Sequence, residues 1–404
     1  MLKHFINTIS SRHFWRTANF SEMSQLNAAR LMRTIAINLG AGLIAVYMFK
    51  LGYSLVFISL FWAAYFLFKV AVMLPLAQVV AAIGPRKSII VSNFLYIPSM
   101  VAFVFLPEYG MWSLVVTIVF QTSSAALYDM GYLVGLSRLS RGHKEGRAVA
   151  MMKMVEMIAK GLSPLIGGLL AMLFDPRASI IVSILCFFMA SMPLIRMVDS
   201  MKVGFKLAPK GFPWRQVSHS LLAQLPIGFD IYASSTAWSL FLAALIFSTK
   251  DNQVYAELGA LTSLILLVSI GSAYIFGKII DKKAGGELLL WTAVANIVAN
   301  LFRAFVRTPV AAIGTNAAHE VVATGYSMAY TRVMMDTANH TGYRVFYIAM
   351  TQLTVNLGAG LAALALAAVI ALLGSSAGFS AFYLVTAVVV SGIAFTKFSI
   401  YKKA

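Results

Sequence analysis

Residues 54–87 read SLVFISLFWAAYFLFKVAVMLPLAQVVAAIGPRK, a long apolar run followed by a short loop with two basic residues. About 20 apolar residues in a helix are enough to cross a hydrocarbon core of about 30 Å. The same arrangement of a long apolar run and a short polar break recurs along all 404 residues. The sequence therefore predicts an all-α polytopic membrane protein.

Twelve such runs predict twelve transmembrane helices. They lie at 31–49, 54–82, 88–106, 112–136, 148–172, 178–197, 218–248, 255–280, 286–306, 309–331, 344–373 and 378–398. The longest connection on one side follows the sixth run and divides the chain near its midpoint, as in transporters built from two parallel repeats. We therefore expect an N-terminal segment 1–30, a six-helix bundle 31–197, a linker 198–217, a second six-helix bundle 218–398 and a tail 399–404.

The composition excludes several other classes of protein. Hydrophobic residues make up 60% of the chain and charged residues 11%, against about 25% charged in a soluble domain. The net charge of +18 does not indicate nucleic-acid binding, because the basic residues are spread over loops and form no basic domain. The single cysteine, Cys186, has no partner for an internal disulfide and no metal-ligand neighbours, so neither a metal nor a cofactor is expected.

The distribution of basic residues predicts the orientation. Of the 32 lysines and arginines, four fall inside the predicted spans and 24 lie in the tails and in alternate loops. The opposite loops hold only four, which are Lys50, Arg177, Lys250 and Arg307. Basic loops remain in the cytoplasm, so both termini are expected there, in a cell membrane.

Two loops carry a family resemblance. The loop GKIIDKKAG at 277–285 resembles the G-x-x-x-D-R/K-x-x-G signature of the major facilitator superfamily. The matching loop of the first half, 77–87, keeps Gly84, Arg86 and Lys87 but lacks the acidic residue. The fifth span also resembles the Gly/Pro-rich segment of facilitator antiporters, and glycines at this spacing let helices approach closely. Its residues are Gly161, Pro164, Gly167 and Gly168.

The resemblance covers nearly the whole chain and implies helices one, four, seven and ten around a central cavity. It also implies a cytoplasmic latch made by the two loops. The candidate latch residues are Gly277, Asp281, Lys282, Arg86, Lys87, Asp129 and Arg332. Asp281 is expected to accept bonds from a helix N-terminus or from Arg332, and Asp129 to serve Arg86 or Lys87. The alternative is that these are solvated surface charges.

Charged residues at bilayer depth are candidate functional sites. His319 and Glu320 lie ten and eleven residues into the tenth span, which is about 15–17 Å deep at about 1.5 Å per residue. Desolvation lets a carboxylate bind protons near neutral pH, and histidine titrates there already. Glu320 is the preferred proton-coupling residue, with His319 and Asp230 as further candidates. The alternatives are a structural role for the His319–Glu320 pair and, for Asp230 in the inner leaflet, pairing with Arg30 or Arg33.

Other polar residues inside the spans are candidates for the substrate cavity. They are Lys69, Asn38, Glu156 and Asn316. Lys69 lies near the middle of its span and requires a carboxylate, a wet cavity or an anionic substrate group. Glu156 shares a helical face with two lysines and is either part of a neutral group or a ligand. Arg303, near the outer end of the ninth span, is expected to extend its charged end to the interface.

Together these features predict a secondary transporter that moves a small solute by alternating access, coupled to protons and leaning towards export. The chain is expected to act as a monomer in the lipid bilayer. ATP-driven transport is excluded, because no G-x-x-x-x-G-K-[ST] motif occurs. A membrane enzyme acting on lipid-linked substrates is the first alternative, but no catalytic constellation is present. A receptor or scaffold is the second, but no loop is long enough to form a soluble domain.

Overall fold

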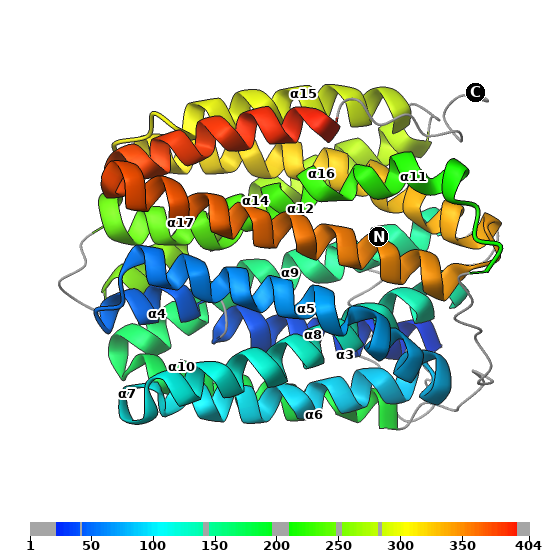
Figure 1. Cartoon of the computed structure of the whole chain (residues 1–404), viewed down its shortest axis with the longest axis horizontal. Helices are drawn as coiled ribbons and strands as arrows, with labels where there is room; N and C mark the ends of the chain where they lie inside the picture. Colours follow the sequence, from blue (N-terminus) through cyan, green and yellow to red (C-terminus); the bar gives the residue numbers. More distant parts are fainter. Residues whose placement is uncertain are drawn as a thin grey trace, which may run out of the picture.

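The computed structural model describes residues 22–40, 43–139, 145–195, 210–247, 253–281 and 285–393. In these ranges the backbone is helical apart from short turns and breaks, and it contains no strand. The helices run roughly along the longest axis of the molecule, side by side (Figure 1). They form an all-α polytopic membrane fold of twelve spans in two six-helix bundles, which confirms the predicted fold class.

The first bundle contains helices α3 to α10. Their bounds are α3 Glu22–Leu39, α4 Ile44–Lys50, α5 Leu55–Ile83, α6 Pro85–Val104, α7 Leu106–Tyr109, α8 Met111–Leu139, α9 Glu145–Leu173 and α10 Pro176–Ile195. The first span consists of α3 and α4, and α7 is a single turn between the third and fourth spans. Helix α3 begins before the predicted start at residue 31. Arg33, which we counted among the 24 basic residues of the tails and alternate loops, therefore lies inside a helix.

The second bundle contains helices α11 to α17. Their bounds are α11 Trp214–Leu222, α12 Gln224–Tyr232, the π-helix η2 Ala233–Ala237, α13 Trp238–Phe241, the π-helix η3 Leu242–Ile246, α14 Gln253–Asp281, α15 Gly285–Arg303, α16 Pro309–His340, α17 Arg344–Val390 and the 3₁₀ turn η4 Ser391–Ile393. The seventh span is thus a chain of short segments from α11 to η3. The last two spans are both part of α17, where only Gly374, at φ 77°, leaves the helical conformation.

Local sequence explains where several spans begin. Ser54 caps α5, since its Oγ accepts a hydrogen bond of 3.1 Å from the backbone N–H of Phe57. Thr308 caps α16 in the same way, with the N–H of Ala311 at 3.3 Å. Between α5 and α6, Gly84 adopts φ 85° and Pro85 follows at the first helical position. Glycine and proline therefore make the sharp turn that the sequence places in this loop.

The spans differ in how apolar they are. Eight helical segments of the described residues are long and apolar enough to cross a membrane, with Met157–Leu173 as a shorter apolar segment. The most apolar is 344–393, with a mean hydropathy of 2.4. Helices α15 and α16 are not among the eight, because polar and charged side chains such as Asn300 and Glu320 interrupt their apolar sequence. Two helices that carry candidate site residues, α15 and α16, are therefore not clear spans by hydropathy alone.

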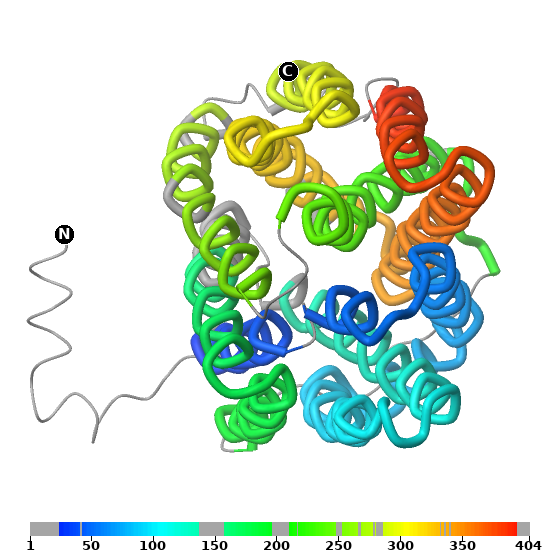
Figure 2. The backbone as a smooth tube through the Cα atoms, turned by 90° about the vertical axis from the view of Figure 1, so that its left-hand side faces the viewer, coloured from blue at the N-terminus to red at the C-terminus, as the bar shows by residue number. Residues whose placement is uncertain are grey.

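The two bundles meet along two pairs of long helices. Helix α9 packs along α14, and α5 packs along α17 (Figure 2). Glycine permits the first contact, because a Cβ on Gly168 would overlap the carbonyl oxygen of Tyr255, and a Cβ on Gly259 would overlap that of Pro164. Ser263 also donates a hydrogen bond to the carbonyl oxygen of Gly161. The fifth-span segment therefore lies against the second bundle.

The same segment also packs within its own bundle. A Cβ on Gly167 would overlap the backbone carbonyl of Leu39 at the end of α3. Helix α9 thus presents adjacent glycines to two different helices, α3 on one side and α14 on the other. This is the close helix approach that the Gly/Pro spacing predicts.

Candidate functional site

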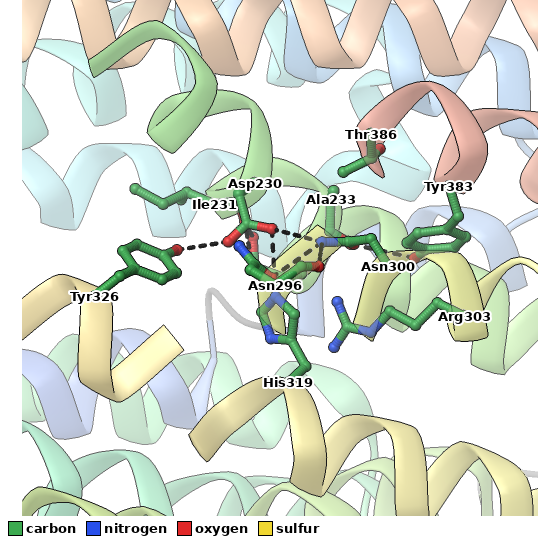
Figure 3. Close-up of polar contacts among 12 residues, drawn as sticks. Asp230, Ile231, Ala233, Asn296, Asn300, Arg303, His319, Tyr326, Tyr383 and Thr386 are labelled. Atoms are coloured by element: carbon green, nitrogen blue, oxygen red, sulfur yellow. Dashed lines mark hydrogen bonds and ion pairs between the residues drawn. The ribbon is translucent and has the colours of Figure 1, made fainter. Parts of the chain in front are cut away.

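The main polar cluster of the second bundle is centred on Asp230 of α12. Its side chain is fully buried, and two helices, α15 and α16, supply its partners (Figure 3). Tyr326 of α16 donates its hydroxyl to Oδ2 at 2.5 Å, and Asn300 of α15 donates Nδ2 to Oδ1 at 3.2 Å. His319 of α16 completes the set, with its Nε2 3.3 Å from Oδ1. Both oxygens of this buried carboxylate therefore have hydrogen-bond partners.

The partners of Asp230 differ from those predicted. We considered Arg30 or Arg33, which belong to the first bundle, but the observed partners all come from the second. Asn300 lies one turn from the end of α15, and two π-helices, η2 and η3, follow Asp230 in the seventh span. The position of Asp230 in the inner leaflet stays a prediction.

A buried arginine continues this cluster along α15. Arg303 lies one turn after Asn300, and its Nη2 donates to Oδ1 of Asn316 at 2.9 Å. The guanidinium rests on the ring of Trp238, with Cζ 4.5 Å from the centroid. Only 1% of Arg303 is exposed, so the expectation that it extends to the interface is wrong. It stays inside because α13 and α17 cover the end of α15 with aromatic side chains.

Glu320 follows His319 but faces a different helix. Adjacent residues on a helix point about 100° apart. His319 is therefore directed to α12 while Glu320 accepts a hydrogen bond of 3.0 Å from Ser269 of α14. Ser269 is also 3.3 Å from the hydroxyl of Thr324. Glu320 is half-buried, and among the described residues no cation lies within ion-pair distance of its carboxylate.

The first bundle has its own buried charge, Arg33 of α3. Only 2% of this residue is exposed. It donates to Oδ1 of Asn93 at 2.7 Å and to Oγ of Ser124 at 3.0 Å, on α6 and α8. Its guanidinium also lies over the ring of Tyr128, 4.1 Å from the centroid. Arg33 thus joins three helices of the first bundle through neutral partners.

Lys69 and Asp129 form an ion pair between α5 and α8. The distance from Nζ to Oδ2 is 2.7 Å. The side chain of Lys69 is 8% exposed and that of Asp129 is 33% exposed. Lys69 therefore has the carboxylate that its depth requires. Asp129 does not pair with Arg86. Arg86 instead donates to the carbonyl oxygens of Leu194 and Ile195 at the end of α10.

The remaining candidates are scattered. Asn38 donates to the carbonyl oxygen of Thr34 in its own helix, at 2.8 Å, and Asn316 pairs with Arg303. In the latch, Gly277 is half-buried and Lys87 is exposed. The other candidates lie outside the described side chains and are Glu156, Asp281, Lys282 and Arg332. No group of three His, Cys, Asp or Glu side chains that could hold a metal ion is found in the described part of the chain.

Sequence reasoning missed several members of the cluster around Asp230. Tyr326 and Asn300 gave no signal as ligands, because a tyrosine or asparagine in a span is common as helix–helix contact. One periodic signal was available: His319 and Tyr326 are seven residues apart and share a helical face, as do Asn296, Asn300 and Arg303. The partner helix of each face cannot be read from that spacing.

Two bundles of six helices with buried polar clusters define a membrane transporter, and the comparisons identify the family. The model of the Major Facilitator Superfamily matches residues 27–363. The chain therefore belongs to this superfamily, whose members are transporters. No protein of curated function matches the sequence.

Several solved structures share the fold. The transporter FucP, a fucose:proton symporter of E. coli, has 12% identity and a TM-score of 0.62, covering 92% of this chain and 97% of FucP. A bacterial homologue of the iron transporter ferroportin has 12% identity and a TM-score of 0.67, covering 95% and 100%. The human organic anion transporter MFSD10 has 13% identity and a TM-score of 0.65, covering 91% and 98%. At these identities the likeness establishes the fold alone.

Proposed function

We propose that this protein is a proton-coupled secondary transporter that moves a small solute across the cell membrane by alternating access. The proton is carried by Glu320. The observation that supports this role most directly is the setting of its carboxylate, which is half-buried and, among the described residues, accepts one hydrogen bond, from Ser269. A carboxylate with a single donor loses only one hydrogen bond when it takes up a proton.

Asp230 is less suited to that task. Three side chains, Tyr326, Asn300 and His319, approach its two oxygens. Protonation would disrupt several of these contacts at once, whereas protonation of Glu320 disturbs one. Asp230 therefore orients His319, which we propose as the second proton-coupling candidate of this cluster.

The relatives give limited support to proton coupling. One structure with the same fold is that of a fucose:proton symporter. The same fold thus accommodates proton coupling in that protein. The coupling residues proposed for this chain rest on its own contacts, since 12% identity carries no residue over.

The direction of transport that we favour is export. The Gly/Pro segment of α9 resembles that of facilitator antiporters, and its glycines lie at contacts with α3 and α14. We also propose that both termini are cytoplasmic, as the basic loops require, and that Asp281 and Arg332 form part of a cytoplasmic latch. A monomer is sufficient for this mechanism, because both bundles belong to one chain.

The test of coupling compares two transport modes in one reconstituted protein. A substrate is first found by screening a solute library in proteoliposomes with an imposed pH gradient. Glu320→Gln imitates the protonated side chain, so gradient-driven accumulation should be lost while exchange of substrate without a gradient continues. Ser272→Ala, one turn from Ser269 on the same helix, is the control and should retain both modes.

Two results would count against this assignment. If accumulation survives in Glu320→Gln, the proton is carried elsewhere, and His319→Gln becomes the next variant to measure. If exchange is lost together with accumulation while the protein remains folded, Glu320 binds substrate or supports the structure.

A further inference from the structure

The charge of Arg33 is not balanced by the residues that touch it. Its bonds go to Asn93, Ser124 and, at 3.4 Å, Ser92, which are all neutral. Its Nε donates to no atom. No carboxylate among the described residues bonds to it. A fully buried guanidinium that has only neutral partners is unfavourable unless an anion is present for part of the working cycle.

The nearest ion pair does not supply that anion. Asp129 follows Tyr128, on whose ring Arg33 rests, but its carboxylate is bonded to Lys69 at 2.7 Å. Tyr65 lies within electrostatic range of both Arg33 and Asp129, so these side chains share one neighbourhood. With Lys69 and Asp129 neutralising each other, the neighbourhood retains the positive charge of Arg33.

The buried arginine of the second bundle is different. Arg303 is as deeply buried as Arg33, but two carboxylates, Asp230 and Glu320, lie within electrostatic range of it. Among the described carboxylates only Asp129 lies in such range of Arg33, and it is already paired with Lys69. The two bundles therefore differ in their charge balance, and the uncompensated cation belongs to the first. An anion is needed there and not beside Arg303.

We infer that the transported solute is a small organic anion, whose negative group is held beside Arg33 in the first bundle. This inference rests on the proposed function. The free Nε–H of Arg33 is a donor for a carboxylate, which guanidinium groups bind well. The rings of Tyr96, Tyr128 and Phe187 surround the guanidinium at 4.1–5.4 Å, and this aromatic lining favours an organic body over a bare inorganic ion.

A cationic solute is the alternative that this charge balance opposes. Asp129 is one-third exposed and offers a ligand its point of entry to this neighbourhood. A cation bound there would compete with Lys69 and leave three positive charges around a single carboxylate. An anion brings the same group of charges to neutrality.

The experiment measures binding by thermal unfolding of the purified full chain in a neutral detergent. The probes are benzoate, succinate, citrate and inorganic phosphate as anions, choline and tetraphenylphosphonium as cations, and glucose as a neutral solute. A ligand that binds only the folded state raises the melting temperature in proportion to its occupancy. An organic anion should give a saturable rise, and the cations and glucose should give none.

Variants then locate the site. Arg33→Gln removes the charge and should weaken anion binding about tenfold or more, as expected for a lost hydrogen bond to a charged group. Arg33→Lys keeps the charge, tests the same position if the glutamine variant does not fold, and should weaken binding less. Lys160→Gln removes an exposed cation of the same bundle and should leave binding unchanged.

The outcomes separate this inference from the proposed function. If a cation or glucose stabilises the protein and is transported while no anion is, the protein remains a transporter and the anion inference fails. If organic anions bind with dependence on Arg33 but no flux follows in proteoliposomes, the site stands and the transport function fails. Stabilisation by no organic anion, or unchanged binding in a folded Arg33→Gln variant, overturns the inference.

Discussion

Buried charges in this protein are stabilised in three ways. Asp230 is surrounded by neutral donors and a histidine, Lys69 and Asp129 pair directly, and Arg33 relies on amide and hydroxyl acceptors and on aromatic rings. Each arrangement joins helices that are distant in sequence. The effects of substitution should therefore depend on which charge is left without a partner.

The ion pair of the first bundle allows a double-variant test. Asp129→Asn leaves Lys69 buried beside Arg33 without a carboxylate, so stability should fall by about 1–3 kcal/mol. This is less than for a fully buried pair, because solvent screens the part of Asp129 that is exposed. The double variant Asp129→Asn with Lys69→Met should recover most of the loss in thermal unfolding. Equal stability of the single and double variants would show that the pair is not coupled.

Tyr326 should contribute to stability through one bond. Tyr326→Phe removes the hydroxyl that donates to Asp230, and a hydrogen bond to a charged group is worth about 1.5–3 kcal/mol. The melting temperature should fall accordingly. Tyr109→Phe, on an exposed residue of α7, is the comparison and should change it little. A melting temperature that stays unchanged in Tyr326→Phe would mean that Asp230 finds another donor.

The cluster around Asp230 marks the limit of sequence analysis. His319, Glu320 and Asp230 were predicted as polar residues at depth, because charge inside an apolar run is visible without a structure. Their partners were not predicted, since the bond from Tyr326 to Asp230 joins residues 96 positions apart. Arg303 was placed wrongly because its covering side chains, Trp238 and Tyr383, come from other spans.

At the scale of helices, glycines decide how closely α9 and α14 pack. Gly168→Ala would place a methyl group against the carbonyl of Tyr255, and such overpacking costs about 1–3 kcal/mol. Lower thermal stability and slower transport are expected. Gly271→Ala, also on α14, meets nothing within 4 Å and should be tolerated. If both variants have the same thermal stability and the same transport rate, the close approach of α9 and α14 is not important for function.

Helix boundaries were predicted less well than helix existence. The lipid core demands a minimum length of apolar sequence, so the twelve runs were visible. The breaks were not: α3 and α4 separate around Gly40, and the seventh span is divided by η2 and η3. These local departures depend on packing, which hydropathy does not report.

At the scale of the whole molecule, the two halves have opposite buried charges on corresponding spans. Arg33 belongs to the first span and Asp230 to the seventh, and each bonds to the third and fourth spans of its own half. The repeat was predicted from the loops near residues 84 and 285, but the opposite charges were not. In the two proposals above, one bundle holds the anion and the other carries the proton.

Orientation can be measured by cysteine labelling. In a Cys186→Ser background, single cysteines at Glu108 and Ser375 should react with an impermeant reagent added outside the cell. Cysteines at Arg215, in the first turn of α11, and at Gly342, between α16 and α17, lie at the other end of the bundles and should react only after permeabilisation. The reason is the excess of basic residues on that side. A reversed pattern would overturn the orientation.

Gly374 bears on how the chain is made. It is the one residue of α17 outside the helical conformation, so the last two spans are joined directly as a helical hairpin. This hairpin has the highest mean hydropathy of the candidate spans. Helices α15 and α16, synthesised just before, are not among the segments that are apolar enough to be clear spans, and α17 packs against both. We therefore expect stable insertion of the helix that carries His319 and Glu320 to need α17, so that a chain that stops before Arg344 is exposed to the quality control of the cell.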